Sequence, residues 1–467
     1  MSNNEIGNVL LALSVVLAST HFGGYLFVRL RQPRLVGEIL AGILLGPFVL
    51  GRIAPSLSAD LFGTSETSMV LGFIYWFGLL LLMFISGSQV RRVLAQENQK
   101  ETAWILGIGT PLPFFIVLAL GLFSVLPLES LVGSAGQETS ALLILAIAVA
   151  VTSIPVISRI FYDLKILHTR FASLILGAAV LEDIILWAVL AIATAIASSA
   201  TLAQEHVVVE ISSHIVATIA YIATALFLAP PILKKIHGSR WNIFLKSSSL
   251  GYIILVLFLY TVVAALLEVN LVFAAFLAGF GVVGGVSGNE RERFSKELDS
   301  IEQFSTSTFI PIYFTLIGYR LVFGTEFSLS MLLLFLIGSS ILALLSVGLA
   351  AKLAGFKGLD IVNIAVTTNA RGGPGIVLAS VAYDAGIINA AFYTTLVLAA
   401  VLTSQAAGVW LRFILHKGWP LLSSNPEETW GTAPQLGRQS GDLHAFTTQE
   451  QHEPSRTGFP TVTDDQH

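Results

Sequence analysis

Two adjacent acidic residues, Glu182 and Asp183, lie in the middle of an apolar segment that reads FASLILGAAVLEDIILWAVLAIA. An ionised carboxylate at mid-membrane depth costs on the order of 3 kcal/mol, so acids in such places usually mark ion or proton pathways. Successive residues of an α-helix point about 100° apart. We therefore expect one acid to face an ion cavity and the other to meet a neighbouring side chain.

Two other apolar segments contain residues that suit a continuous helix poorly. The first reads AIAVAVTSIPVISRIF, in which Thr152 and Ser153 precede Pro155. This proline alone would be compatible with a kinked helix. The second reads IAVTTNARGGPGIVLASVAY and is expected to unwind, because it contains a run of weak helix formers: Asn369, Gly372, Gly373 and Pro374.

These residues together could bind a monovalent cation or a proton. A carboxyl group buried away from water takes up a proton more readily, so a proton and a cation would compete for it. The hydroxyl and backbone oxygens freed at Thr152 and Ser153 are suitable ligands for a dehydrated alkali cation. Arg371, a basic residue deep within the second broken segment, is the natural partner of Glu182, because a charge pair offsets the cost of burying both groups.

The composition sets the environment in which this chemistry must operate. The chain has 467 residues, of which 55% are hydrophobic, and its mean hydropathy is +0.81. Only 12% are charged, against about 25% in soluble proteins. These values exclude a soluble enzyme and a nucleic-acid-binding protein. The absence of cysteine excludes disulfides, a thiolate nucleophile and Cys-ligated metal. The sequence predicts an integral, multi-pass membrane protein that works within the lipid bilayer.

Apolar segments long enough to cross about 30 Å of hydrocarbon as helices recur along the chain. The sequence predicts an all-α polytopic fold of about thirteen transmembrane helices, near 7–30, 35–53, 68–90, 103–126, 140–160, 171–199, 209–236, 245–267, 270–287, 305–324, 328–354, 359–384 and 388–416. If segments 1–6 and 8–13 are two inverted repeats, the broken helix is the fifth in each. Paired broken helices in inverted repeats cross at a transporter's binding site.

Basic residues predict the orientation of these helices. Eighteen of the 25 Lys and Arg residues lie in one set of alternate connections, whereas the opposite set contains only Arg52 and Arg320. Because cytoplasmic loops are enriched in Lys and Arg, we expect the N-terminus outside and the C-terminus in the cytoplasm, in the cell membrane.

Two regions follow from the composition. Residues 1–417 are expected to form the transmembrane exchanger domain, and the polar residues 418–467 a disordered cytoplasmic tail. No phosphate-binding GxxxxGK[ST] and no HExxH is present. We therefore expect no cofactor and no enzymatic activity, with an ion or proton gradient as the energy source.

Four segments carry a resemblance to a known family: 30–51, 151–167, 176–187 and 369–388. With them, about residues 10–415 resemble the monovalent cation/proton antiporter-2 family of the sodium/proton exchanger superfamily. The resemblance implies a scaffold-and-core fold, elevator-like alternating access and commonly a homodimer. It also implies that Asp183 matches the aspartate that binds cation and proton, as the metal ligand of the site, and that Arg371 matches the family's arginine.

Three positions depart from that family's pattern: Glu182, Ala343 and Gly375. Relatives usually carry Asp, Asn or Gln at the first, electrogenic relatives carry a lysine at the second, and a glutamate is frequent at the third. We expect Arg371 to hold Glu182 ionised while Asp183 alone exchanges, giving one-for-one transport. If Glu182 also titrates, two protons could move per cycle.

Two other function classes remain as alternatives. A sodium-coupled symporter of a small organic solute could share crossed broken helices, and would need a larger polar cavity. A membrane-embedded enzyme or sensor lacks any supporting motif. The types of oxygen ligand do not distinguish a sodium site from a potassium site.

Four other polar residues are expected to have structural roles. Arg320 and Asp384 are expected to be interfacial, and Thr403 and Ser404 could bond across helices.

Overall fold

The computed structural model describes residues 2–30, 32–93, 99–166, 169–199, 216–237, 239, 242–284, 290–324 and 327–423. Within these ranges the chain is helical, and β-structure is limited to an isolated bridge between Val132 and Ile388. In the described part of the chain, eight helices are long and apolar enough to cross a membrane, and shorter apolar helices accompany them. The all-α polytopic fold is confirmed, whereas the count of thirteen stays a prediction.

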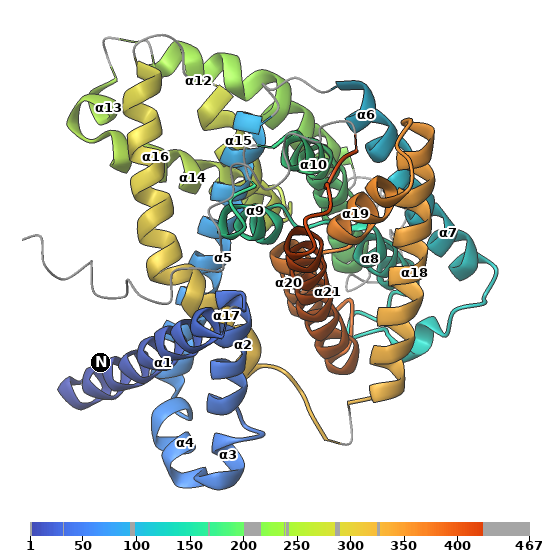
Figure 1. The fold of residues 1–467 in the computed structure, drawn as a ribbon. Helices are drawn as coiled ribbons and strands as arrows, with labels where there is room; N and C mark the ends of the chain where they lie inside the picture. Colours follow the sequence, from blue (N-terminus) through green and yellow to red (C-terminus); the bar gives the residue numbers. More distant parts are fainter. Residues whose placement is uncertain are drawn as a thin grey trace, which may run out of the picture.

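The helices form two groups that lie side by side (Figure 1). We call the first the scaffold group. It consists of α1 (Asn3–Arg29), α2 (Arg34–Leu45), α5 (Ser65–Val93), α14 (Ser249–Leu266), α15 (Leu271–Gly284), α16 (Glu290–Ser307) and α17 (Phe309–Tyr319). The short helices beside it are α3 (Leu50–Ile53), α4 (Pro55–Phe62), η3 (Thr224–Leu228), α12 (Ala229–His237) and α13 (Ile243–Ser247).

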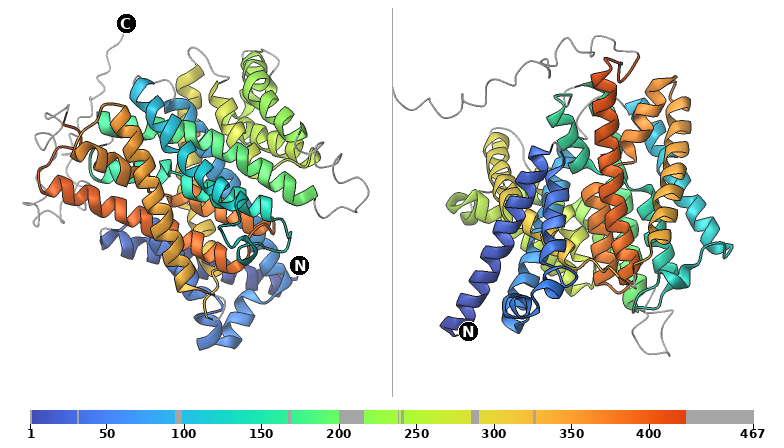
Figure 2. Two further views of the ribbon diagram at one scale, coloured as in Figure 1. Left: turned by 90° about the vertical axis from the view of Figure 1, so that its right-hand side faces the viewer. Right: turned by 60° about the horizontal axis from the view of Figure 1, so that its bottom comes forward.

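The second group, here called the core group, contains both predicted broken helices. Its members are α6 (Gln99–Trp104), η1 (Ile105–Gly109), α7 (Pro111–Leu122), η2 (Leu128–Ser130), α8 (Glu138–Ala150), α9 (Ile154–Asp163), α10 (Arg170–Ser199), α18 (Leu329–Leu353), α19 (Leu359–Thr368), α20 (Gly372–Asp384) and α21 (Ala390–His416). Helix α10, which carries the two acids, also packs against α5 and α15 of the scaffold group. It therefore lies where the two groups meet. The right-hand view of Figure 2 shows the blue N-terminal helices of the scaffold group beside the orange and red C-terminal helices of the core group.

Two helix crossings in the scaffold group have the same construction. At the crossing of α2 with α17, a Cβ added to Gly42 would collide with the carbonyl oxygen of Thr315, and one added to Gly318 with that of Ile39. Each carbonyl belongs to the residue three positions before the opposite glycine. The crossing of α5 with α15 repeats this pattern, with Gly87 and Gly279 against the carbonyls of Phe276 and Phe84. In two repeats made of segments 1–6 and 8–13, the second segment corresponds to the ninth and the third to the tenth. The crossing of the second with the tenth segment is therefore equivalent to the crossing of the ninth with the third, and the shared construction is what two repeats require.

Both predicted helix breaks are present. The first separates α8 from α9, and Val151 between them has an extended backbone. The second separates α19 from α20. Pro155 and Pro374 each fall in the first turn of the second half-helix, where a missing N–H removes no helical hydrogen bond. The prolines therefore begin the second halves of the broken helices.

The chain remains packed beyond the predicted end of the domain at residue 417. Asp360 Oδ1, in the first turn of α19, accepts hydrogen bonds from Ser423 N and Oγ at 2.9 and 2.7 Å. Asn363 Nδ2 donates to the carbonyl of Leu421 at 3.1 Å, and Leu422 is 1% exposed. Residues 418–423 therefore belong to the folded region and not to the tail. The remainder of the predicted tail, 424–467, lies outside the described residues.

Candidate functional site

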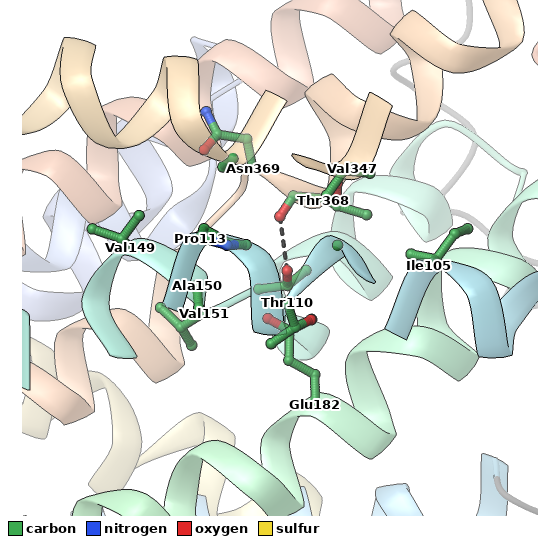
Figure 3. A pocket seen from close by; sticks show the side chains of 13 residues that line it. Ile105, Thr110, Pro113, Val149, Ala150, Val151, Glu182, Val347, Thr368 and Asn369 are labelled. Atoms are coloured by element: carbon green, nitrogen blue, oxygen red, sulfur yellow. Dashed lines mark hydrogen bonds between the residues drawn. The ribbon is translucent and has the colours of Figure 1, made fainter. Parts of the chain in front are cut away.

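The two broken helices bond to each other where they cross. Thr152 Oγ1 donates to the carbonyl of Thr368 at 2.9 Å (Figure 3, dashed line), and Ser153 N donates to the carbonyl of Ala370 at 2.7 Å. Carbonyls at the end of α19, which lack partners within their own helix, are thus bonded by the first break. The structure brings the predicted residues Thr152 and Ser153 to the second broken helix.

Close packing at this crossing requires a glycine at the start of α20. Gly372 has a φ of +36°, and a Cβ there would collide with Val156 and with Ser153 Oγ. A Cβ at Gly373, by contrast, would meet nothing within 4 Å. Of the two predicted glycines, Gly372 therefore has a steric reason to be there.

Glu182 reaches from α10 into a small cavity between the broken helices and α7 (Figure 3). Its side chain is 4% exposed, and Oε1 has no hydrogen-bond partner among the described residues. The hydroxyls of Thr110 and Thr152 and the backbone N–H of Thr152 face the carboxyl group. Asn369 also lines the cavity, which has room for roughly one water molecule. Five of the lining residues carry a side-chain oxygen, the other eight are apolar or glycine, and no Lys, Arg or His lines the cavity.

Ala343 of α18 lines the same cavity, at the position where the resemblance places a lysine in electrogenic relatives. Asn369 is held by its amide nitrogen, which donates to Ser340 Oγ of α18 at 3.1 Å. The amide oxygen of Asn369 is buried without a hydrogen-bond partner in the described part of the chain. A methyl group thus occupies the side of the cavity where a charged amine would have balanced Glu182.

The predicted contact between Glu182 and Arg371 is not formed. Arg371 is 2% exposed. Among the described side chains, none donates to or accepts from its three side-chain nitrogens, and no carboxylate lies within 4 Å of it. Its guanidinium lies 5.6 Å from the centre of the Phe335 ring on α18. The residue sits at the start of α20 with its side chain toward α18, whereas Glu182 points into the cavity beside α7. Attraction between them acts only through space.

The side chain of Asp183 lies outside the described residues, as does that of Pro155. The backbone places Asp183 on α10, directly after Glu182. The predicted role of Asp183 as the cation and proton ligand stays a prediction. In the described part of the chain, no three His, Asp or Glu side chains cluster as a metal site would require.

Sequence reasoning did not identify Thr110 as part of the site. It lies between η1, a π-helical turn, and α7, which begins with Pro111. Such turns are frequent at functional sites, and the Thr–Pro step within an apolar segment was the available signal. The sequence predicts for Thr403 and Ser404 only that they bond across helices. Both do, because their hydroxyls accept hydrogen bonds from backbone N–H groups at the start of α20.

Polar contacts join the scaffold and core groups near the ends of α17 and α20; we call them the polar seam. Arg320 Nη1 donates to Asp384 Oδ1 at 2.7 Å, and the Tyr75 hydroxyl donates to Asp384 Oδ2 at 2.8 Å. The Arg320 guanidinium lies over the Tyr75 ring, 4.1 Å from its centre. Two further bonds connect Tyr393 Oη with the Ile317 carbonyl and Val322 N with Thr394 Oγ1. Arg320 and Asp384 thus bond two helix groups together.

Comparison with known proteins identifies relatives over most of the chain. Residues 16–417 match the family model described as the transmembrane sodium/hydrogen exchanger. Cation/H(+) antiporter 18 of Arabidopsis thaliana is 27% identical over 406 residues, which are 85% of this chain and 47% of that protein. K(+)/H(+) antiporter 1 of Saccharomyces cerevisiae is 26% identical, over 91% of this chain and 48% of its own length. The chain spans about half the length of these two relatives.

A shorter relative matches over nearly its whole length. The Na(+)/H(+)-K(+) antiporter GerN of Bacillus cereus is 23% identical over 86% of this chain and 95% of its own. Among solved structures, the sodium proton antiporter MjNhaP1 from Methanocaldococcus jannaschii has the same fold, with a TM-score of 0.53 and 16% identity over 87% of this chain and 96% of that one. Because the family match covers both broken helices and the acidic pair between them, the chain belongs to the transmembrane sodium/hydrogen exchanger family.

Proposed function

We propose that the protein is a secondary antiporter that exchanges a monovalent cation, sodium or potassium, for protons. The observation that carries this proposal is the buried Glu182 carboxyl group, which faces a small cavity between two broken helices, with threonine hydroxyls in its lining and no cationic side chain beside it among the described residues. A carboxylate in such a place is stable only if it binds a cation or takes up a proton.

In the proposed cycle, Asp183 binds the cation and the proton in turn. Thr152 contributes oxygen ligands, since its hydroxyl hydrogen is engaged with the Thr368 carbonyl and its lone pairs stay available. Ser153 Oγ accepts from Val156 N at 3.3 Å and so holds the start of α9 in place. Because Arg371 does not contact Glu182, we favour the version in which both carboxyl groups titrate. That version moves up to two protons per cycle.

Alternating access would occur by movement of the core group against the scaffold group. The acidic pair lies on α10, which packs against both groups, and the polar seam closes one end of the contact between them. Opening this end requires the Arg320–Asp384 bridge to break. By the distribution of Lys and Arg, the seam would face the outside, with the C-terminus in the cytoplasm. We further propose that the protein works as a homodimer in the cell membrane.

A symporter of a small organic solute is less well supported. The cavity at Glu182 has room for roughly one water molecule, which suits a dehydrated cation or a proton and excludes an organic solute in this conformation. Names of the relatives, all antiporters of cations and protons, favour the same choice.

The proposal is tested by cation/proton exchange in proteoliposomes that contain a pH-sensitive dye. Sodium and potassium are added separately to the wild type, to Asp183→Asn and to Asp60→Asn, which alters an exposed acid on α4. We expect exchange in the wild type and in Asp60→Asn, and none in Asp183→Asn. If neither ion moves protons through the folded wild type, or if Asp183→Asn is fully active, the proposed mechanism is wrong.

A further inference from the structure

Helix α20 begins within the membrane-spanning core, where its first N–H groups have no partners in their own helix. Two of these groups are bonded from a different helix, α21. Gly372 N donates to Ser404 Oγ at 3.0 Å, and Arg371 N donates to Thr403 Oγ1 at 3.4 Å. Both hydroxyl-bearing side chains are 3% exposed. A pair of buried hydroxyls therefore caps the second half of the broken helix.

This pair of hydroxyls has a counterpart in the first repeat. Thr403 and Ser404 are adjacent on the helix that follows the second broken helix, just as Glu182 and Asp183 are adjacent on the helix that follows the first. Glu182 faces the backbone N–H of Thr152, two residues before the first residue of α9. In the first repeat the described acid, Glu182, thus points toward the start of a half-helix, and in the second repeat two neutral hydroxyls do so.

The hydroxyls are oriented by their own helix. Ser404 Oγ donates to the carbonyl of Ala400 at 2.7 Å, and Thr403 Oγ1 donates to the carbonyl of Ala399 at 2.9 Å. Because a hydroxyl has one hydrogen, each oxygen is left as an acceptor facing α20. Each hydroxyl thus donates one hydrogen bond within α21 and accepts one from a backbone N–H at the start of α20. These two bonds fix the orientation of each hydroxyl, so α21 sets the position of the first N–H groups of α20.

The capped residues adjoin the exchange site on both sides. Gly372 packs against Val156 and Ser153 of the first broken helix, and the carbonyl of Ala370, two residues earlier, accepts from Ser153 N at 2.7 Å. Asn369, one residue earlier, lines the Glu182 cavity. A shift of the start of α20 would therefore move Asn369 in the cavity lining and the Ala370 carbonyl that holds Ser153.

We propose that Thr403 and Ser404 are positioning residues for cation binding: they hold the start of α20 so that residues 368–370 keep their place against Thr152 and Ser153. They do not touch the cation themselves. This inference rests on the proposed antiport function, because the site that they position is the exchange site.

The test compares hydroxyl removal at these residues with the same change elsewhere on α21. Thr403→Val and Ser404→Ala remove the acceptors, and Thr403→Ser keeps one. The control is Thr395→Val, because Thr395 is fully buried on the same helix and its hydroxyl donates to the Ala391 carbonyl, with no bond to another helix among the described residues. Cation-dependent proton exchange is measured in proteoliposomes over a range of cation concentration and pH, with the amount of folded protein normalised by size-exclusion chromatography.

We expect Thr403→Val and Ser404→Ala to raise the apparent cation KM roughly tenfold, as follows from leaving a buried N–H unpaired, with a smaller change in maximal rate. Thr403→Ser and Thr395→Val should keep a KM within about twofold of the wild type, since neither unpairs a buried N–H of α20. Unchanged KM and pH profile in both hydroxyl-free variants would overturn the inference, as would an equal effect of Thr395→Val or a failure of Thr403→Ser to restore KM. Failure of antiport itself is recognised separately, because the wild type would then show no cation-dependent exchange in the same vesicles.

Discussion

The Arg320–Asp384 bridge offers a quantitative test of how the two helix groups move. Asp384 accepts one bond from Arg320 at 2.7 Å and one from Tyr75 at 2.8 Å, so Asp384→Ala removes both. A hydrogen bond to a charged group contributes about 1.5–3 kcal/mol. The side chains of Arg320 and Asp384 are 35% and 18% exposed, which reduces the expected loss to about 1–2 kcal/mol.

This loss acts only on the conformation in which the polar seam is closed. If opening separates Arg320 from Asp384, the ratio of open to closed protein rises by a factor of about 5–30 when the bridge is lost. The double variant Arg320→Ala/Asp384→Ala should open less than the sum of the single effects, because both substitutions remove the same interaction.

The chain contains no cysteine, so one introduced cysteine can report on opening without background. Leu321, next to Arg320, is 2% exposed, and Leu321→Cys should react slowly with a membrane-impermeant maleimide. In the Asp384→Ala background we expect faster reaction, by about the same 5–30-fold, with reagent added from the outside. Reagent applied to the opposite face should have no such effect, which also tests the predicted orientation.

The matched control is Glu101→Gln. Arg170 Nη2 lies 2.8 Å from Glu101 Oε1, in an ion pair that joins α6 and α10 within the core group. Breaking a bridge inside one group should leave the labelling rate unchanged. An unchanged rate in Asp384→Ala, or an equal increase in Glu101→Gln, would refute the assignment of the polar seam as a contact that opens during transport.

Three further outcomes are expected. Gly87→Ala forces a Cβ onto the Phe276 carbonyl at the α5–α15 crossing and should destabilise the protein by about 1–3 kcal/mol. Gly72→Ala on the same helix is the control, because its Cβ meets nothing within 4 Å and should leave the stability unchanged. Thermal unfolding in detergent measures both variants. Glu182→Gln should lower the number of protons exchanged per cation if both carboxyl groups titrate, which reversal-potential measurements in proteoliposomes would detect, and an unchanged ratio would assign exchange to Asp183 alone. Deletion of residues 424–467 should retain the thermal stability of the wild type, whereas deletion from residue 418 onward should lower it, because the buried Leu422 and the bonds to Asp360 are lost; equal stability of the two truncations would contradict the packing of residues 418–423.

Features set by local physics could be predicted from the sequence. Helix breaks at Thr152–Pro155 and at Asn369–Pro374 follow from proline, glycine and hydroxyl residues within apolar segments, and both are present. The all-α membrane fold follows because an apolar segment must satisfy its own backbone hydrogen bonds in lipid. Position along a helix also predicts that Glu182 and its neighbour point in different directions.

Contacts between segments distant in sequence depended on packing. Glu182 and Arg371 appeared complementary in charge, but the direction in which each side chain leaves its backbone separates them, Glu182 toward Thr110 and Arg371 toward Phe335. The caps from α21 and the Arg320–Asp384 bridge likewise depend on which helix faces become neighbours. Helix propensity and hydropathy act over one or a few turns, so the sequence alone determined where the special residues lie along each span. The tertiary structure decided which of them meet, because that is set by the crossing of whole helices.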